Sequence, residues 1–206
     1  MRAPRQCRKG ARLFLVFALG ATTTEAHLVT TGLGPVYDGI GHLLLSLDDV
    51  LPVVGLALFA GLRGPKAGRL TLLFLPLIWI AGAIAGLANH GQPILGQIFT
   101  ACSFLVLGIL IAADWELPTV VVAALAVLVG GVHGFFNGVA MRGAGLRPAL
   151  LQLTGIAVML FILVAVISGF VVSLPRAWMR IVIRVVGSWI AAIGLLSLGW
   201  SLRFGQ

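Results

Sequence analysis

Three polar side chains near the start of the first long apolar segment are spaced to share one face of a helix. At about 100° per residue, with Asp38 as zero, His42 falls at about 40° and Asp49 at about 20°. Asp48 falls at about 280° and points elsewhere. Carboxylates and an imidazole offer oxygen and nitrogen ligands, and such a mixed set suits nickel or cobalt. The stripe predicts part of a metal site. One helix cannot close that site, because its ligands lie on one side of the ion.

A second interpretation of this stretch stays open. The run 48–52, Asp-Asp-Val-Leu-Pro, also fits a turn between a short helix at the membrane surface and the true span. Asp38 and the acidic pair would then lie at a surface-facing helix start. Ionisable side chains inside an apolar helix are functional by default, which favours the metal site.

A second polar pair lies in a later apolar segment. His133 and Asn137 are four residues apart and share a helix face. Gly130, Gly134 and Gly138 recur beside them and allow a neighbouring helix to approach closely. We expect His133 to add a ligand to the site begun in the first segment, with Asn137 as a weaker one. A hydrogen-bonded packing role for His133 is the alternative.

The other histidines are weaker candidates. His90 lies in the run 89–93, Asn-His-Gly-Gln-Pro, which is typical of a solvent-exposed turn. His27 becomes a good ligand only as the first residue of a processed chain, where its α-amine and ring chelate one ion. Cys102 is expected to pack as a small apolar residue.

The composition indicates that these side chains belong to a membrane protein. Of the 206 residues, 60% are hydrophobic and 10% are charged, whereas a soluble domain carries about 25% charged residues. The net charge of +8 does not indicate a nucleic-acid partner, because five of the 14 basic residues lie in the first twelve positions and most others lie between apolar runs. The expected partner is the lipid bilayer.

The chain divides into an export signal and one membrane domain. Residues 1–26 have a basic start, a short apolar run and small residues before a cleavage site after Ala26, although a short uncleaved anchor is the alternative. The domain 27–206 then contains six apolar stretches, at 39–62, 70–88, 94–113, 118–141, 149–173 and 181–202. The sequence therefore predicts an all-α polytopic bundle of about six transmembrane helices after a cleavable signal peptide.

The basic residues predict the orientation. An exported start places the mature N-terminus outside a plasma membrane such as the bacterial inner membrane. The segments then predicted to be cytoplasmic carry Arg63, Lys66, Arg69, Arg176, Arg180 and Arg184, against Arg142, Arg147 and Arg203 outside. The third loop, 113–117, is also predicted to be cytoplasmic but has no basic residue.

The run 27–42, His-Leu-Val-Thr-Thr-Gly-Leu-Gly-Pro-Val-Tyr-Asp-Gly-Ile-Gly-His, followed by the acidic run at 48–52, resembles the HupE/UreJ family. The Gly-Val-His-Gly run at 131–134 resembles that family's second histidine-glycine motif. The family comprises membrane accessory proteins of hydrogenase and urease gene clusters. The resemblance implies import of nickel, or of cobalt in some members. Three residues separate Asp38 from His42, and Asn137 stands where a stronger ligand is expected, so the chain resembles the more divergent second branch.

We therefore expect a metal-uptake protein that supplies a metalloenzyme such as hydrogenase or urease. Nickel or cobalt is its cargo, and no prosthetic group is expected. Homo-oligomers or metalloenzyme maturation proteins are expected partners. The predicted ligands are Asp38, His42, Asp49, His133 and His27, with Asn137, Asp48 and His90 as weaker candidates.

Two alternatives remain for the function. One is an accessory or assembly protein that transports nothing. The other is an intramembrane serine protease, for which the closest motif is Val-Ile-Ser-Gly at 166–169, without a first glycine or a following histidine. We do not expect an enzyme. The sequence has no Gly-x-x-x-x-Gly-Lys-Ser/Thr motif for ATP.

Overall fold

The computed structural model describes residues 31–91, 95–174 and 177–204, and these residues form helices without strands. The predicted all-α class is confirmed. The predicted signal 1–26 and the candidate ligand His27 lie outside the described residues. In chain order the helices are α2 (Pro35–Leu45), α3 (Leu47–Leu62), α4 (Pro65–Ala88), α5 (Gly96–Ala112), α6 (Thr119–Ala140), the 3-10 turn η1 (Arg142–Ala144), α7 (Leu146–Val172) and α8 (Ala177–Phe204).

The first predicted span, 39–62, is not a single helix, which corrects the sequence-based expectation. α2 and α3 are bent by 72° relative to one another. Ser46 between them has an extended backbone, with φ −81° and ψ 105°. A serine at the N-cap position with Asp48 and Asp49 in the first turn is a typical helix start, since acidic groups there are stabilised by the helix dipole. A short helix, α2, does precede a longer one, as the alternative interpretation expected. The break lies at Ser46, before the acidic pair, and not within the run 48–52.

The described helices are long and apolar enough for several membrane crossings. α4, α6, α7 and α8 each qualify as a membrane span. If the bent pair of α2 and α3 is counted as one further span, the described residues contain up to five spans. α5, which corresponds to the predicted span 94–113, has 17 residues. It is about 25 Å long at 1.5 Å per residue, slightly short of the hydrocarbon core of about 30 Å. The count of six spans remains a prediction.

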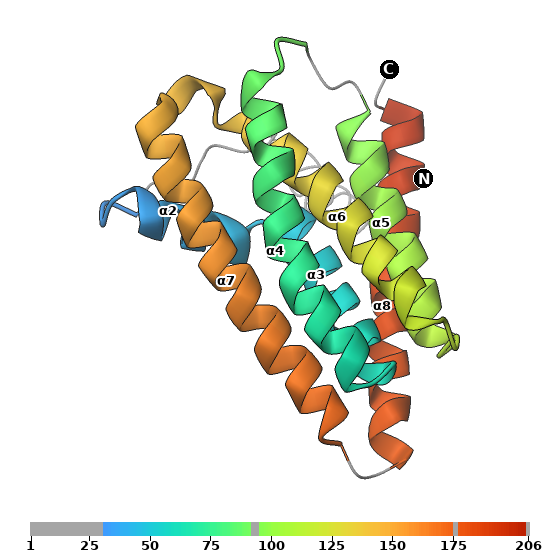
Figure 1. The fold of residues 1–206 in the computed structure, drawn as a ribbon. Coiled ribbons are helices and arrows are strands. Elements are labelled where there is room, and N and C mark those ends of the chain that lie inside the picture. Colours follow the sequence, from blue (N-terminus) through green and yellow to red (C-terminus); the bar gives the residue numbers. More distant parts are fainter. Residues whose placement is uncertain (1–30, 92–94, 175–176, 205–206) are drawn as a thin grey trace, which may run out of the picture.

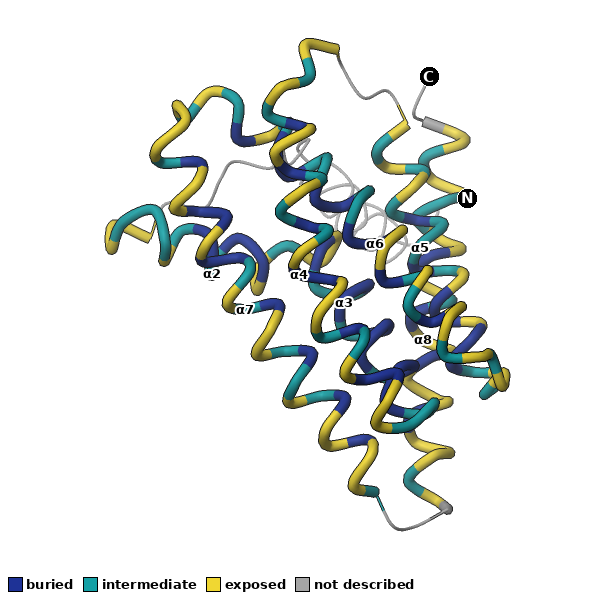
Figure 2. Tube along the Cα trace, in the orientation of Figure 1, coloured by how far each residue is buried: buried dark blue, intermediate teal, exposed yellow. Residues whose placement is uncertain are grey.

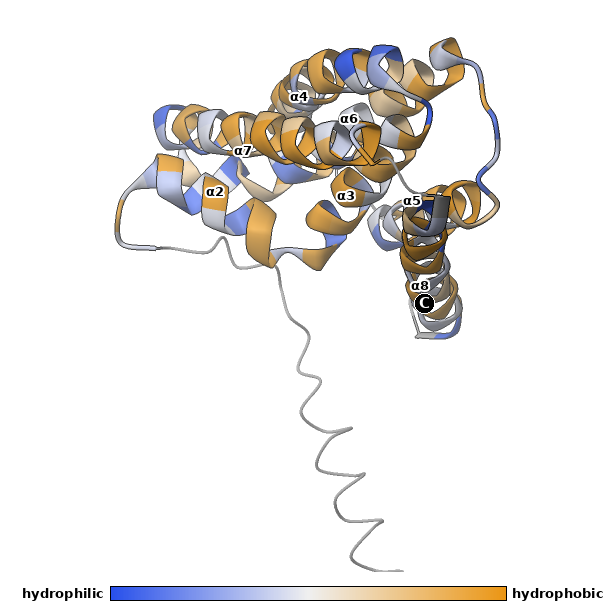
Figure 3. Ribbon diagram, turned by 90° about the horizontal axis from the view of Figure 1, so that it is seen from below, coloured by the Kyte–Doolittle hydropathy of each residue, from blue (hydrophilic) through white to orange (hydrophobic). Residues whose placement is uncertain are grey.

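α3 lies at the centre of the bundle and contacts every other described α-helix (Figure 1). α4 packs mainly against α6, α5 against α8, and α2 against α7. The outer faces of the helices are largely exposed (Figure 2) and largely hydrophobic (Figure 3). Val120 on α6 and Leu196 on α8, for example, are 77% and 74% exposed. Such apolar outer faces suit contact with lipid.

α6 packs against α4 almost backbone to backbone. A Cβ added at Gly134 would lie 2.2 Å from the carbonyl oxygen of Trp79. A Cβ added at Gly138 would lie 2.0 Å from the carbonyl oxygen of Ala83. Neither distance is possible for real atoms, so only glycine fits at these two positions. The predicted glycine packing face is therefore present, and it fixes the position of His133 and Asn137 relative to α4.

We predict that Gly134→Ala destabilises the protein by about 1–3 kcal/mol, because the added methyl group meets backbone that cannot move aside as a side chain would. Thermal unfolding of the purified protein in detergent measures the effect. Gly199→Ala is the matched control, since a Cβ at that helical glycine meets nothing within 4 Å. Equal melting temperatures for the two variants would contradict the close α4–α6 packing.

At one end of the bundle, one carboxylate joins three segments of the chain. Asp114, in the loop between α5 and α6, forms an ion pair with Arg63 from the end of α3. Its second oxygen lies 2.8 Å from Nη2 of Arg180 on α8. The Arg63 side chain is only 6% exposed. The third loop therefore has no basic residue of its own but carries the acid that pairs with two arginines, which places these three segments at the same end.

We predict that reporter fusions at Gly64 and Glu116 both report the cytoplasmic side, whereas a fusion at Gly91 reports the outside. The physical reason is the excess of basic residues at the Asp114 end. Different sides for Gly64 and Glu116 would contradict the fold. An external result for both would reverse the orientation and leave the fold intact.

Candidate functional site

A buried polar cluster surrounds Asp49 in the first turn of α3. Its Oδ2 lies 3.3 Å from Nε2 of His42, and its Oδ1 lies 3.4 Å from Nδ1 of His133. The amide nitrogen of Asn137 donates to both carboxylate oxygens, each at 3.0 Å. All four side chains are at most 7% exposed. The cluster therefore combines a carboxylate, two imidazoles and an amide inside the bundle.

The bend between α2 and α3 brings the first half of the cluster together. His42 lies in the last turn of α2 and Asp49 in the first turn of α3. The N–H of Ser46 donates to the carbonyl of His42, and the N–H of Asp49 donates to that of Ser46, at 2.9 and 3.2 Å. His42 and Asp49 thus meet across a helix break rather than along one helical stripe.

α6 supplies the second half, and its neighbours fix the histidine ring. His133 stacks on Trp79 of α4 with ring centroids 5.7 Å apart. Its Nε2 lies 3.1 Å from the hydroxyl of Ser103 on α5, and that hydroxyl donates to the carbonyl of Thr100. Both ring nitrogens of His133 therefore face oxygen atoms. A metal ion could bind this ring only by displacing one of them.

The side-chain oxygen of Asn137, Oδ1, is buried without a hydrogen-bond partner among the described residues. Its amide nitrogen is fully used, because it donates to Asp49 and also to the carbonyl of His133 at 3.0 Å. Exchanging the amide nitrogen and oxygen would turn an acceptor toward the carboxylate, so the orientation shown is the favourable one. An unpaired buried acceptor costs about 1–3 kcal/mol. Asn137 thus keeps one oxygen available for a donor or a cation.

A cavity of about 250 Å³ adjoins the cluster. Asp48, Gln97 and Thr100 bring further oxygen atoms to its wall. Asp48, unlike Asp49, is exposed, and it also lines a second cavity of about 430 Å³ between α5 and α8. The first cavity is lined by His42, Ser46, Asp48, Asp49, Gly96, Gln97, Thr100, His133, Phe136, Asn137, Val139 and Ala140.

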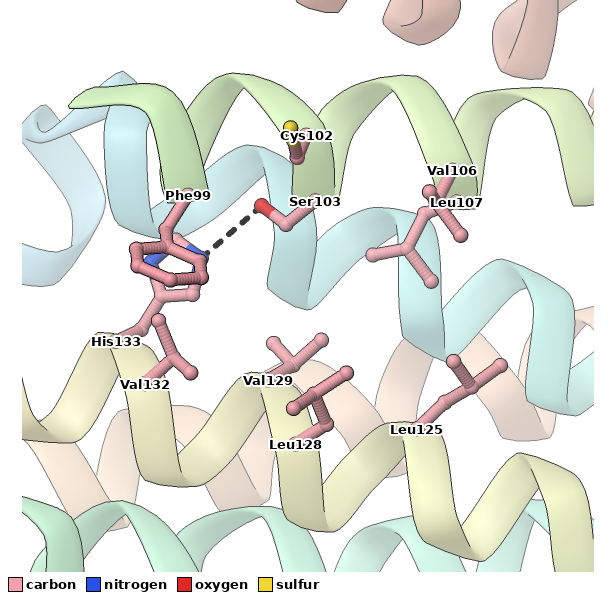
Figure 4. Close-up of a pocket in the computed structure, with 10 residues that line it drawn as sticks. All are labelled: Phe99, Cys102, Ser103, Val106, Leu107, Leu125, Leu128, Val129, Val132 and His133. Carbon is pink, nitrogen blue, oxygen red and sulfur yellow. Dashed lines mark hydrogen bonds between the residues drawn. The ribbon is translucent and has the colours of Figure 1, made fainter. Parts of the chain in front are cut away.

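On its other side, His133 borders an apolar cavity of about 160 Å³ between α5 and α6 (Figure 4). The hydrogen bond between Ser103 and His133 crosses one end of this cavity, and valine and leucine side chains line the rest (Figure 4). Cys102, a free cysteine that is half-buried, also lines this cavity. His133 therefore borders a polar cavity on one side and an apolar cavity on the other.

The structure joins some of the predicted ligands and separates others. His42, Asp49, His133 and Asn137 meet, and Asp48 lines the cavity beside them. The carboxylate of Asp38 instead accepts hydrogen bonds from the N–H and hydroxyl of Thr31, at 2.6 and 2.7 Å. His90 is exposed in the loop after α4 and lines none of the cavities described above. The ligand roles themselves remain predictions.

Two members of the cluster's surroundings were not found from the sequence. Ser103 and Trp79 lie in apolar runs that carry no motif, and they contact His133 only because α4 and α5 pack against α6. Within the described residues, no three histidine, cysteine, aspartate or glutamate side chains are arranged to hold a metal ion. As it stands, the cluster is a hydrogen-bonded network around one carboxylate.

The fold and the cluster define a polytopic helical membrane protein with a buried carboxylate–histidine centre. The family model described as HupE / UreJ protein matches residues 15–197, and the chain belongs to this family. It is similar to Protein HupE of Rhizobium leguminosarum bv. viciae, with 24% identity over 168 residues, which cover 82% of this chain and 71% of that protein. No solved structure matches the chain. The family resemblance inferred from the motifs is confirmed.

We predict that Asn137→Leu lowers the free energy of unfolding by about 1.5–3 kcal/mol, because Asp49 loses charge-assisted hydrogen bonds while the branching and the number of side-chain heavy atoms are kept. Thermal unfolding in detergent without added metal measures the loss. Gln97→Leu is the control, since Gln97 is exposed and forms no hydrogen bond within the described residues. A loss no greater than that of the control would mean that Asn137 does not hold Asp49.

Proposed function

We propose that this protein carries a divalent transition-metal ion, nickel or cobalt, across the membrane through the Asp49 cluster. The proposal rests on one observation: Oδ1 of Asn137 lies beside a cavity and has no hydrogen-bond partner within the described residues. Ionisable side chains inside membrane helices mark ion pathways by default. Imidazole nitrogens with carboxylate and amide oxygens are a ligand set for these ions.

Binding requires the network to open. An ion entering beside Asp49 competes with the amide nitrogen of Asn137 for the carboxylate oxygens. A rotation of the amide then turns Oδ1 toward the cation and removes the unpaired acceptor. His42, which contacts Asp49 through Nε2, can exchange the carboxylate for the ion. The resting network and the ion-bound state therefore use the same four side chains.

The predicted orientation gives the direction of transport. α3 begins at the cluster and ends at the Asp114 ion pairs, so the cluster lies toward the outer side when the Asp114 end is cytoplasmic. The membrane potential favours entry of a divalent cation by about 4.6 kcal/mol per 100 mV, twice the value for a single charge. Uptake of this kind supplies a metalloenzyme such as hydrogenase or urease, the systems that the family resemblance implies.

A non-transporting accessory role is the second candidate, and one observation favours it. Both oxygens of Asp49 already have donors from three side chains, so the cluster also suits a purely structural centre. The protease alternative has less support, because the hydroxyl of Ser168 donates to the carbonyl of Val164 at 2.6 Å and its cavity has no histidine in its lining.

We predict that His42→Ala and Asp49→Asn each reduce nickel uptake at least about 100-fold, since even outer-shell partners of metal ligands contribute about 10–100-fold. Asp48→Asn should raise the KM for the ion and leave the maximal rate nearly unchanged. Asp48 is exposed at the cavity wall and attracts cations without holding them. The measurement is uptake of radioactive nickel or cobalt into vesicles, with the protein in each membrane quantified by immunoblot.

The critical result is the contrast between Asp49→Asn, which should lose uptake, and Asp48→Asn, which should keep its maximal rate of uptake. Normal uptake in both His42→Ala and Asp49→Asn at low external metal would reject transport through the cluster and favour the accessory role. Loss of uptake together with loss of protein from the membrane would assign the cluster to folding instead.

A further inference from the structure

A groove separate from the Asp49 cluster lies between the beginning of α4 and the end of α7. These two helix ends lie at the same end of the bundle (Figure 1). The groove has a volume of about 220 Å³ and opens to the outside of the bundle. It is lined by Pro65, Gly68, Arg69, Leu72, Ala165, Ser168, Gly169 and Val172.

Small residues make the groove. A Cβ at Gly68 would lie 3.2 Å from the hydroxyl oxygen of Ser168, so these two residues form the floor. A Cβ at Gly169 would meet nothing within 4 Å, so the space above this glycine is empty of protein. Leu72 and Val172 add apolar walls, and the hydroxyl of Ser168 is already bonded to its own helix. The body of the groove therefore suits a hydrocarbon chain.

Unpaired positive charge lies at the mouth of the groove. Arg69 lines it, and Lys66 lies three residues earlier on α4, where both side chains are exposed. Neither has an ion-pair or hydrogen-bond partner within the described residues. Arg63 and Arg180 at this end share Asp114, and Arg184 donates to the carbonyl of Ala112. Lys66 and Arg69 are thus left to bind an anion from outside the chain.

We propose that this groove binds an anionic phospholipid, with an acyl chain along Gly169 and Leu72 and the phosphate between Lys66 and Arg69. α4 and α7 are each long and apolar enough to cross a membrane, so the helix ends that form the groove are expected near the lipid headgroups. Basic pockets between membrane helices are suited to anionic headgroups. The glycine and leucine walls add an apolar contact that a free phosphate ion cannot use. The site is independent of the proposed metal uptake.

The test is lipid binding by the purified full-length protein, measured by native mass spectrometry and by thermal stabilisation on titration with phosphatidylglycerol or phosphatidylcholine. The protein should prefer phosphatidylglycerol, and inorganic phosphate should give no stabilisation. The double variant Lys66→Gln/Arg69→Gln should bind phosphatidylglycerol roughly 30-fold more weakly, as expected for two basic residues near an anionic surface. Arg147→Gln, which removes an exposed cation at the other end of the bundle, should bind as the parent does.

A second variant tests the groove without changing the charge. Gly169→Leu fills the empty space and should also weaken phosphatidylglycerol binding. Gly199→Leu is its control, because that glycine also lies in open space but on α8. Unchanged binding in Gly169→Leu, with loss in the double variant, would show a headgroup held by charge alone and overturn the groove. Unchanged binding in the double variant, or equal stabilisation by inorganic phosphate, would overturn the site altogether.

Discussion

A carboxylate buried among membrane helices must be surrounded by donors, and the need to satisfy Asp49 is the constraint on which the arrangement of this bundle depends. Removing an ionised carboxylate from water costs several kcal/mol unless hydrogen bonds and opposite charges compensate. Here the donors come from the end of α2 and from one face of α6, with none from α3 itself. Segments far apart in the chain therefore meet at one side chain.

Two features of the backbone bring the donors to Asp49. One is the break at Ser46, and the other is the glycine packing of α6 against α4. The break turns α2 across the bundle, so that His42 faces back onto the start of α3. The glycines bring α6 so close to α4 that Trp79 stacks on His133 and sets the angle of its ring. Close packing of this kind is effective in lipid, where no hydrophobic force draws apolar helices together. The cluster thus gains its donors from helices whose positions are set by backbone contact.

Helix content and the polar face of α6 could be predicted because both depend on local sequence. Apolar runs bounded by glycine and proline gave the helices, and a spacing of four residues put His133 and Asn137 on one face. The stripe through Asp38 was wrong, because a helical wheel assumes an unbroken helix. The signal for the break was present, since Ser46 precedes the acidic pair at the spacing of a helix start. The contact of Ser103 with His133 could not be predicted, because it depends on which helices are neighbours.

The pairing of α5 with α8 has a consequence for how the chain is made. α5 has 17 residues and packs mainly on α8, which comes last in the chain among the described helices. Their backbones touch, because a Cβ at Gly108 would lie 2.3 Å from the nitrogen of Ala191. During insertion in chain order, α5 must enter the membrane well before its main partner exists. Among the described helices, the α5–α8 contact is therefore the last of the three main helix pairs that can form.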